Sequence, residues 1–307
     1  MSAPHPDLEL LFTAKTHDLG DGLVVGRALP QAGCRAVGPV VFLDHMGPSD
    51  IAAGKGFDVR PHPHIGLATV TYLFEGEIVH RDSLGFVQPI RPGAVNVMVA
   101  GRGIVHSERA SDQTRREGGH LHGIQLWIAL PTHDEECDPS FVHHASTTLP
   151  STEITTPEGA VARVRVLLGE AWGVRSPAVV SSLPFFAIAE LDRGARLEVP
   201  RAIDDVAIYL AAGGITIDDV AIAPRQIAIR AEDRAMSFVA TEPSRVVFVG
   251  GPHLEGVRSR NPRHLEWNFV SSSKERLEDA KRRWVAREFP TIPGDDQERI
   301  PLPGETG

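Results

Sequence analysis

Two histidines one residue apart, His62 and His64, stand at the start of the first long strand-like run of the chain. Residues i and i+2 of an extended strand point to the same side, so both imidazoles reach into the same space. The arrangement recurs after a Gly-rich turn, where His106 and Glu108 are again one residue apart. On two facing strands, these pairs would bring three imidazoles and one carboxylate around one point. That donor set indicates a transition-metal site, which the rest of a β-rich chain would house.

The alternative to a metal site is coincidence, because the chain holds 14 histidines. A second pair in a similar setting favours the metal site. Pro61 and Pro63 lack the N–H that a sheet ladder uses, so they place this strand at an edge or a mouth, where side chains are free to serve a site. The pattern does not fix the ion, because imidazole suits iron, copper, nickel and zinc.

Composition places the chain among ordinary globular proteins, with 42% hydrophobic and 23% charged residues over 307 positions. This length is sufficient for two domains. A net charge of -9 argues against a nucleic-acid surface, which needs basic residues. No apolar run approaches the ~18 residues of a membrane span, and no N-terminal apolar segment appears, so we expect a cytoplasmic protein. The two cysteines, Cys34 and Cys137, permit a disulfide, although a reducing compartment fits better.

Short strand patterns separated by Gly and Pro predict an all-β fold of two tandem barrels. Residues 121–130 alternate in the manner of a half-buried strand, with Gln125 and Trp127 on one side. The second half predicts nine more strands, at residues 161–168, 185–191, 195–199, 206–210, 215–217, 220–222, 227–229, 236–240 and 246–250. No histidine lies between residues 145 and 252, so we expect no metal site in the second barrel.

A helix is predicted near the C-terminus, where Ser272 and Glu275 have the spacing of a capping box. Leu277, Ala280 and Trp284 follow at helical spacing and would pack on a barrel, and Pro290 would stop the helix. The expected domains are an N-terminal metal-binding barrel (1–135), a linker (136–160), a C-terminal barrel without metal (161–255) and a helix with an extended tail (256–307).

Several motifs make the chain resemble the pirin family of bicupins, proteins with two tandem cupin (jelly-roll-like) barrels. The similarity is nearly continuous over residues 40–131, is weaker over the second barrel, and returns at residues 267–270 and in the helix. The motifs that carry it are residues 42–45, 60–66, 69–76, 80–83, 100–108 and 122–127.

This resemblance implies that His62, His64, His106 and Glu108 hold Fe(II), with other divalent transition metals as alternatives. It also implies quercetin 2,3-dioxygenase-like cleavage of a flavonol or a similar enol by O₂. In that hypothesis Glu108 is both ligand and general base for the acidic hydroxyl of the substrate, and the heterocycle opens with loss of carbon monoxide.

Two other functional interpretations stay open. The family also implies an iron-dependent redox-sensing regulator that binds a protein partner, while a metal-free structural bicupin fits the intact ligand pattern least. His80 and His122 either orient a metal ligand or the substrate, or are hydrogen-bonded structural residues. We expect no direct nucleic-acid partner and no membrane partner.

Overall fold

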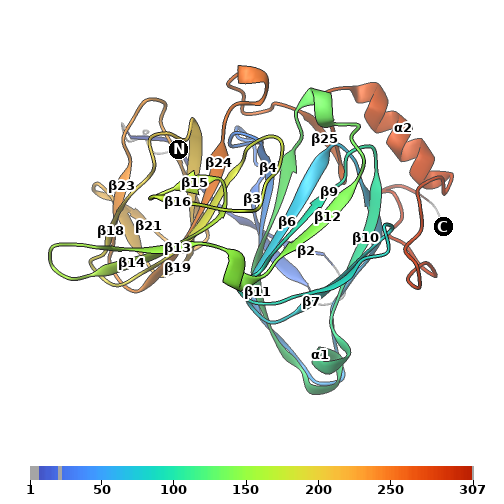
Figure 1. Ribbon diagram of the computed structural model, residues 1–307, viewed down its shortest axis with the longest axis horizontal. Helices are drawn as coiled ribbons and strands as arrows, with labels where there is room; N and C mark the ends of the chain where they lie inside the picture. Colours follow the sequence, from blue (N-terminus) through green and yellow to red (C-terminus); the bar gives the residue numbers. More distant parts are fainter. Residues whose placement is uncertain (1–6, 20–22, 306–307) are drawn as a thin grey trace. The chain divides into compact units, whose positions relative to one another are not determined.

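Alternating side chains and frequent Gly and Pro turns produce strands along most of the chain (Figure 1). This computed structural model describes residues 7–19 and 23–305. They divide into a first unit (residues 16–19, 23–25, 43–146 and 261–305) and a second unit (7–15, 26–42 and 147–260). Within the described residues, a seven-stranded and a four-stranded sheet form the framework of each unit. The predicted all-β fold of two barrels with a C-terminal helix is confirmed.

The sheets β12-β9-β6-β11-β4-β3-β2 and β5-β10-β7-β8 lie mostly in the first unit, although residues 15, 26–29 and 40–42 of the larger sheet are grouped with the second unit. A short pair, β25 and β26, completes the first unit. The strands are β2 (Lys15–Asp18), β3 (Val24–Leu29), β4 (Val40–Ile51), β5 (Asp58–His64), β6 (Leu67–Glu75), β7 (Ile78–Asp82), β8 (Val87–Ile90), β9 (Val95–Val99), β10 (Ile104–Arg109), β11 (Gly119–Ala129), β12 (Ser140–His144), β25 (His264–Glu266) and β26 (Phe269–Ser271).

The second unit is built on the sheets β1-β22-β19-β24-β17-β14-β13 and β18-β23-β20-β21, with a small hairpin of β15 and β16. All nine strands predicted for this half are present, with ends shifted by at most two residues. The strands are β1 (Leu8–Thr13), β13 (Ser151–Thr155), β14 (Val161–Leu168), β15 (Glu170–Ala171), β16 (Val174–Arg175), β17 (Phe185–Leu191), β18 (Arg196–Glu198), β19 (Asp205–Ala212), β20 (Ile215–Ile217), β21 (Val220–Ile222), β22 (Gln226–Arg230), β23 (Ser237–Ala240) and β24 (Ser244–Gly251).

The described helices are few and short: α1 (Asp112–Glu117), α2 (Lys274–Val285) and the 3₁₀ turns η1 (Thr132–Asp134), η2 (Ser146–Thr148) and η3 (Leu254–Gly256). Neither α-helix is long and apolar enough to cross a bilayer. The cap of α2 is Ser273, whose side chain accepts from the N–H of Arg276, one residue later than predicted. Ser272 is instead bound to Glu135, to which both its N–H and its hydroxyl donate.

The apolar face predicted for α2 packs as expected. Leu277, Ala280 and Trp284 are buried in a cluster with Val105 of β10 and Phe269 of β26. Figure 1 shows α2, in red, along this side of the first unit. The C-terminal helix therefore packs against β10, the strand that carries two of the predicted metal ligands.

The observed division of the chain is not sequential, unlike the expected ranges 1–135 and 161–255. N-terminal residues belong to the second unit, and residues after 260 return to the first. The stretch expected to be a linker, 136–160, contains β12 and β13. Each is the edge strand of a seven-stranded sheet. Edge strands expose one side to water and carry polar residues, so their composition resembles that of a linker.

Candidate metal centre

Strand β10 carries the centre of the site because it pairs on both sides, with β5 and with β7. The antiparallel register places His106 opposite His62 of β5. Pro61 and Pro63 keep β5 at the edge of this four-stranded sheet, as predicted. The pairs His62/His64 and His106/Glu108, which are far apart in the sequence, thus lie on neighbouring strands.

The three histidines form one compact cluster. Ring centroids are 4.3 Å apart for His62 and His106, and 5.0 Å apart for His64 and each of the other two. One ligating atom from each residue lies within 4.8 Å of the others, and all three side chains are buried. Among the described residues, no other group of three or more His, Cys, Asp or Glu residues meets this criterion.

Hydrogen bonds at the outer ring nitrogens orient two of these imidazoles. His62 Nδ1 lies 2.8 Å from the carbonyl oxygen of Arg60, and His64 Nδ1 lies 3.0 Å from that of Asn268. A carbonyl oxygen only accepts, so each Nδ1 carries the proton and each Nε2 keeps its lone pair. Nε2 of His64 and Nε2 of His106 lie 3.1 Å apart. Inward lone pairs with outward hydrogen bonds are what a divalent transition metal requires, so the donor set fits the expected ion.

Burial keeps these three imidazoles neutral. It lowers the pKa of His62 from 6.5 to about 4, and it lowers the pKa values of His64 and His106 well below 6.5. The charges that neighbouring imidazoles would carry lower the last two pKa values further. At neutral pH the cluster therefore needs no deprotonation before it can bind a cation.

Glu108 lies outside the compact histidine group. Its carboxylate accepts from Gln125 Nε2 at 3.2 Å and from the Thr71 hydroxyl at 3.4 Å. Burial raises its pKa, while the hydrogen bonds from Gln125 and Thr71, and the positive charge that a protonated His80 would carry, act in the opposite direction. A β-bulge falls between His106 and Glu108 in the pairing with β5. Such a bulge changes where a side chain points, so simple i, i+2 alternation does not describe Glu108 fully.

The two other predicted histidines lie in different surroundings. His80 of β7 is buried, and its Nδ1 is 3.5 Å from Nδ1 of His106. His122 of β11 is also buried, but its Nε2 lies 2.8 Å from Nε2 of His45 and its ring contacts Phe74. Among the described contacts, His80 has a ring nitrogen close to one of the three clustered histidines, and His122 does not.

Sequence reasoning missed several residues that surround the centre. Gln125 and Thr71 hold Glu108, and Trp127 packs edge-on against His64 with centroids 5.1 Å apart. The alternation of residues 121–130 placed Gln125 and Trp127 on one face, and that was the available signal. The strand is not half-buried, however: Trp127 is 8% exposed and Ile128 is fully buried.

Comparison with known proteins decides the family. The pirin family model matches residues 22–128, and the model described as the pirin C-terminal cupin domain matches residues 186–290. A pirin-like protein of Caulobacter vibrioides is 45% identical over 96% of this chain and 99% of its own length. This chain belongs to the pirin family.

Two further matches extend over most of the chain. Pirin of Mus musculus is 30% identical, with 85% of this chain and 86% of the mouse protein covered. The crystal structure of a quercetin 2,3-dioxygenase from Acinetobacter baumannii superimposes with a TM-score of 0.85 at 32% identity, covering 97% of each chain. Both units of this pirin-family chain are therefore cupin barrels, and the histidine cluster lies in the first.

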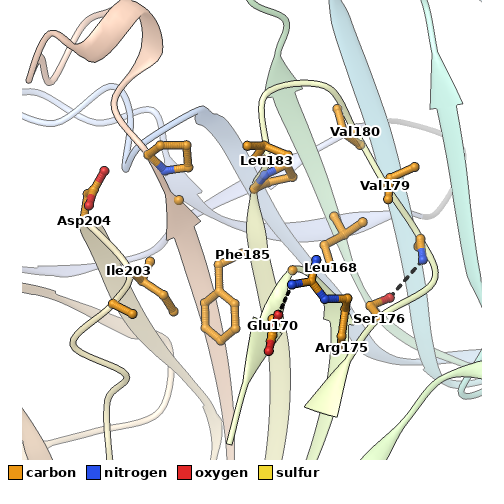
Figure 2. Close-up of a pocket in the computed structure, with 16 residues that line it drawn as sticks. Leu168, Glu170, Arg175, Ser176, Val179, Val180, Leu183, Phe185, Ile203 and Asp204 are labelled. Carbon is orange, nitrogen blue, oxygen red and sulfur yellow. Dashed lines mark hydrogen bonds and ion pairs between the residues drawn. The ribbon is translucent and has the colours of Figure 1, made fainter. Parts of the chain in front are cut away.

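The second cupin unit of this pirin-family chain contains a cavity of about 400 Å³ (Figure 2). Its wall is mostly apolar, with Phe185 and Ile203 among the labelled side chains. The charged residues Arg175 and Glu170 pair with each other. This wall offers carboxylates but no imidazole or thiol, so it differs in kind from the centre of the first unit.

Proposed function

We propose that this pirin-family chain is a metal-dependent dioxygenase that opens the ring of a flavonol or a similar aromatic enol with O₂. The observation that carries the proposal is the cluster of three buried, neutral imidazoles, whose ligating atoms lie within 4.8 Å of one another. Similarity to the Acinetobacter quercetin 2,3-dioxygenase supports the substrate class and the use of O₂.

The proposed ligands are His62, His64, His106 and Glu108, and the proposed metal is Fe(II). When bound there, a divalent iron supplies Lewis acidity toward an enol hydroxyl and redox chemistry toward O₂. Three neutral imidazoles and one carboxylate would leave a net charge of +1, which favours an anionic substrate.

Glu108 is the proposed general base. Without a bound metal, burial raises the pKa of the Glu108 carboxyl, which is the direction that favours proton acceptance. Gln125 and Thr71 donate to it and fix its orientation, while the proton of the acidic substrate hydroxyl passes to one of its oxygens. Trp127 beside His64 helps to exclude water. Overall, the ring takes up both atoms of O₂ and releases carbon monoxide.

The test is anaerobic reconstitution with Fe(II), followed by quercetin and O₂, with flavonol absorbance and carbon monoxide release both recorded. Turnover is expected in the wild-type protein and should vanish in His62→Ala. Glu108→Gln should keep iron but lose most turnover, and undiminished turnover in it would remove the base role. His120→Ala is the matched control, because His120 is 69% exposed.

The same experiment separates the enzyme from the redox regulator. Bound iron without consumption of quercetin would contradict the proposed substrate. Capture of a protein partner that follows the Fe(II)/Fe(III) state would then support the regulatory function.

A further inference from the structure

We infer that His80 and Asp82 are positioning residues that set the ring tautomer and orientation of His106, and so its ability to bind metal. The inference rests on the metal centre proposed above and adds two residues to it. Both come from β7, which pairs with β10 on the side opposite β5, with Asp82 facing His106 in the register.

Asp82 is a fixed, fully buried acceptor. Its Oδ1 accepts from the N–H groups of Leu84 (2.9 Å) and Phe86 (3.1 Å), and its Oδ2 lies 2.9 Å from Nε2 of His80. The turn after β7 therefore holds the Asp82 carboxylate in place without the help of a metal. An ionised carboxylate has no proton to give, so His80 must donate from Nε2.

The hydrogen bond from His80 to Asp82 determines which ring nitrogens of His80 and His106 carry protons. A neutral His80 that is protonated at Nε2 has a lone pair at Nδ1. That Nδ1 lies 3.5 Å from Nδ1 of His106, with ring centroids 5.3 Å apart, at the limit of hydrogen-bond distance. His106 then carries its proton on Nδ1, and its Nε2 lone pair faces Nε2 of His64. In this arrangement His80 is protonated at Nε2 and His106 at Nδ1.

The His80 ring has little freedom to abandon this arrangement. It is 3% exposed and stacks on Phe141 of β12, with centroids 4.4 Å apart and an interplanar angle of 16°. His62 and His64 are oriented by backbone carbonyls, whereas His106 depends on side chains. Consequently His106 is the ligand whose donor strength can be changed by substitution at a distance.

Asp82→Asn is the discriminating variant. Asparagine keeps an Oδ1 acceptor for the two N–H groups of the turn but presents an N–H donor to His80. His80 would then accept at Nε2 and carry its proton on Nδ1, which forces His106 to protonate Nε2, the metal-facing atom. Co²⁺ affinity, measured by competition with a chromophoric chelator, should fall about 10- to 100-fold. The control Asp50→Asn breaks an exposed Asp50–His120 pair in the same unit and should change nothing.

Histidine tautomers in the metal-free protein give a second readout, by long-range ¹H–¹⁵N correlation with His106 assigned from His106→Gln. Wild type should show a protonated Nδ1 at His106, and Asp82→Asn should move the proton to Nε2. His80→Gln should retain much of the affinity, because its amide can accept from His106 and donate to Asp82, whereas His80→Leu should not.

Unchanged Co²⁺ affinity in Asp82→Asn, or an unchanged His106 tautomer, would overturn the inference. A wild-type protein that binds no metal would instead refute the proposed function, and the tautomer measurement would still decide the role of Asp82. If Asp82→Asn fails to fold, equal affinities of His80→Gln and His80→Leu would overturn the inference.

Discussion

His106 of β10 lies directly opposite His62 of β5, and their rings are 4.3 Å apart. Because the two strands are hydrogen-bonded neighbours, the distance between these two histidines is set by sheet geometry rather than by flexible loops. A metal bound here would link two strands of one sheet.

Removal of His106 should abolish most metal-dependent stabilisation. A ligand that binds only the folded state adds about 2.7 kcal/mol when present at about 100 times its dissociation constant. Wild-type protein should gain stability of that order with saturating Co²⁺ in thermal scans. His106→Ala should lose most of the gain, and the control His120→Ala should keep it. A full Co²⁺ response in His106→Ala would contradict the assignment of the ligands.

Acid should destabilise the metal-free protein between pH 6.5 and about pH 4. Burial lowers the pKa of His62 from 6.5 to about 4, so in this window the unfolded chain binds a proton that the folded chain does not. The free energy of unfolding therefore falls as the pH falls. His62 alone contributes about 3 kcal/mol to this loss. Urea unfolding measured across this pH window should show that the free energy of unfolding falls less steeply with pH in His62→Gln than in wild type. An equally steep fall in both proteins would be evidence against His62 as the cause.

Asp295 should stabilise strand β10, which carries His106 and Glu108. It accepts from the Ser107 hydroxyl at 2.6 Å and from Arg109 Nε at 2.7 Å, so it holds the two β10 residues that flank Glu108. Asp295→Ala should lower the free energy of unfolding by roughly 1–3 kcal/mol. Urea unfolding is the measurement, with the exposed neighbour substitution Asp296→Ala as control. Equal effects at the two positions would show that the β10 contacts are not the cause.

Gly66 should tolerate no side chain. Its φ is +66°, and a Cβ there would lie 2.0 Å from the carbonyl oxygen of Val270. Gly66→Ala should cost about 3 kcal/mol or more, because the clash adds to the ~1–2 kcal/mol of a left-handed conformation. Gly85→Ala is the control: Gly85 also has a positive φ, but nothing lies within 4 Å of its Cβ position. If thermal unfolding shows equal losses of stability in Gly66→Ala and Gly85→Ala, the clash with Val270 is not the cause.

The sequence predicted the histidine cluster because a strand has a simple period. Alternation places His62 and His64 on one side whatever the details of the sheet. The nine strands of the second half were predictable for the same reason, since short apolar runs between turns have few other ways to be buried.

Features that depend on partners far along the chain could not be predicted. Asn268 holds His64 through a backbone carbonyl, so its side chain carries no signal of that role. The bulge before Glu108 and the edge strands at residues 140–144 and 151–155 arise from pairing, which local composition does not encode. Ser273 rather than Ser272 caps α2, while Ser272 donates to Glu135, a residue far away in the sequence.

The contact between His64 and Asn268 also sets an order of events during synthesis. The first unit needs residues 261–305, yet residues 147–260 of the second unit are translated before them. A growing chain that has reached residue 260 contains all three histidines but not the carbonyl that orients His64. The cluster can therefore acquire its final geometry only after residue 268 has been translated, so any metal bound in that geometry would be bound after the strands of both units up to residue 260 have been made.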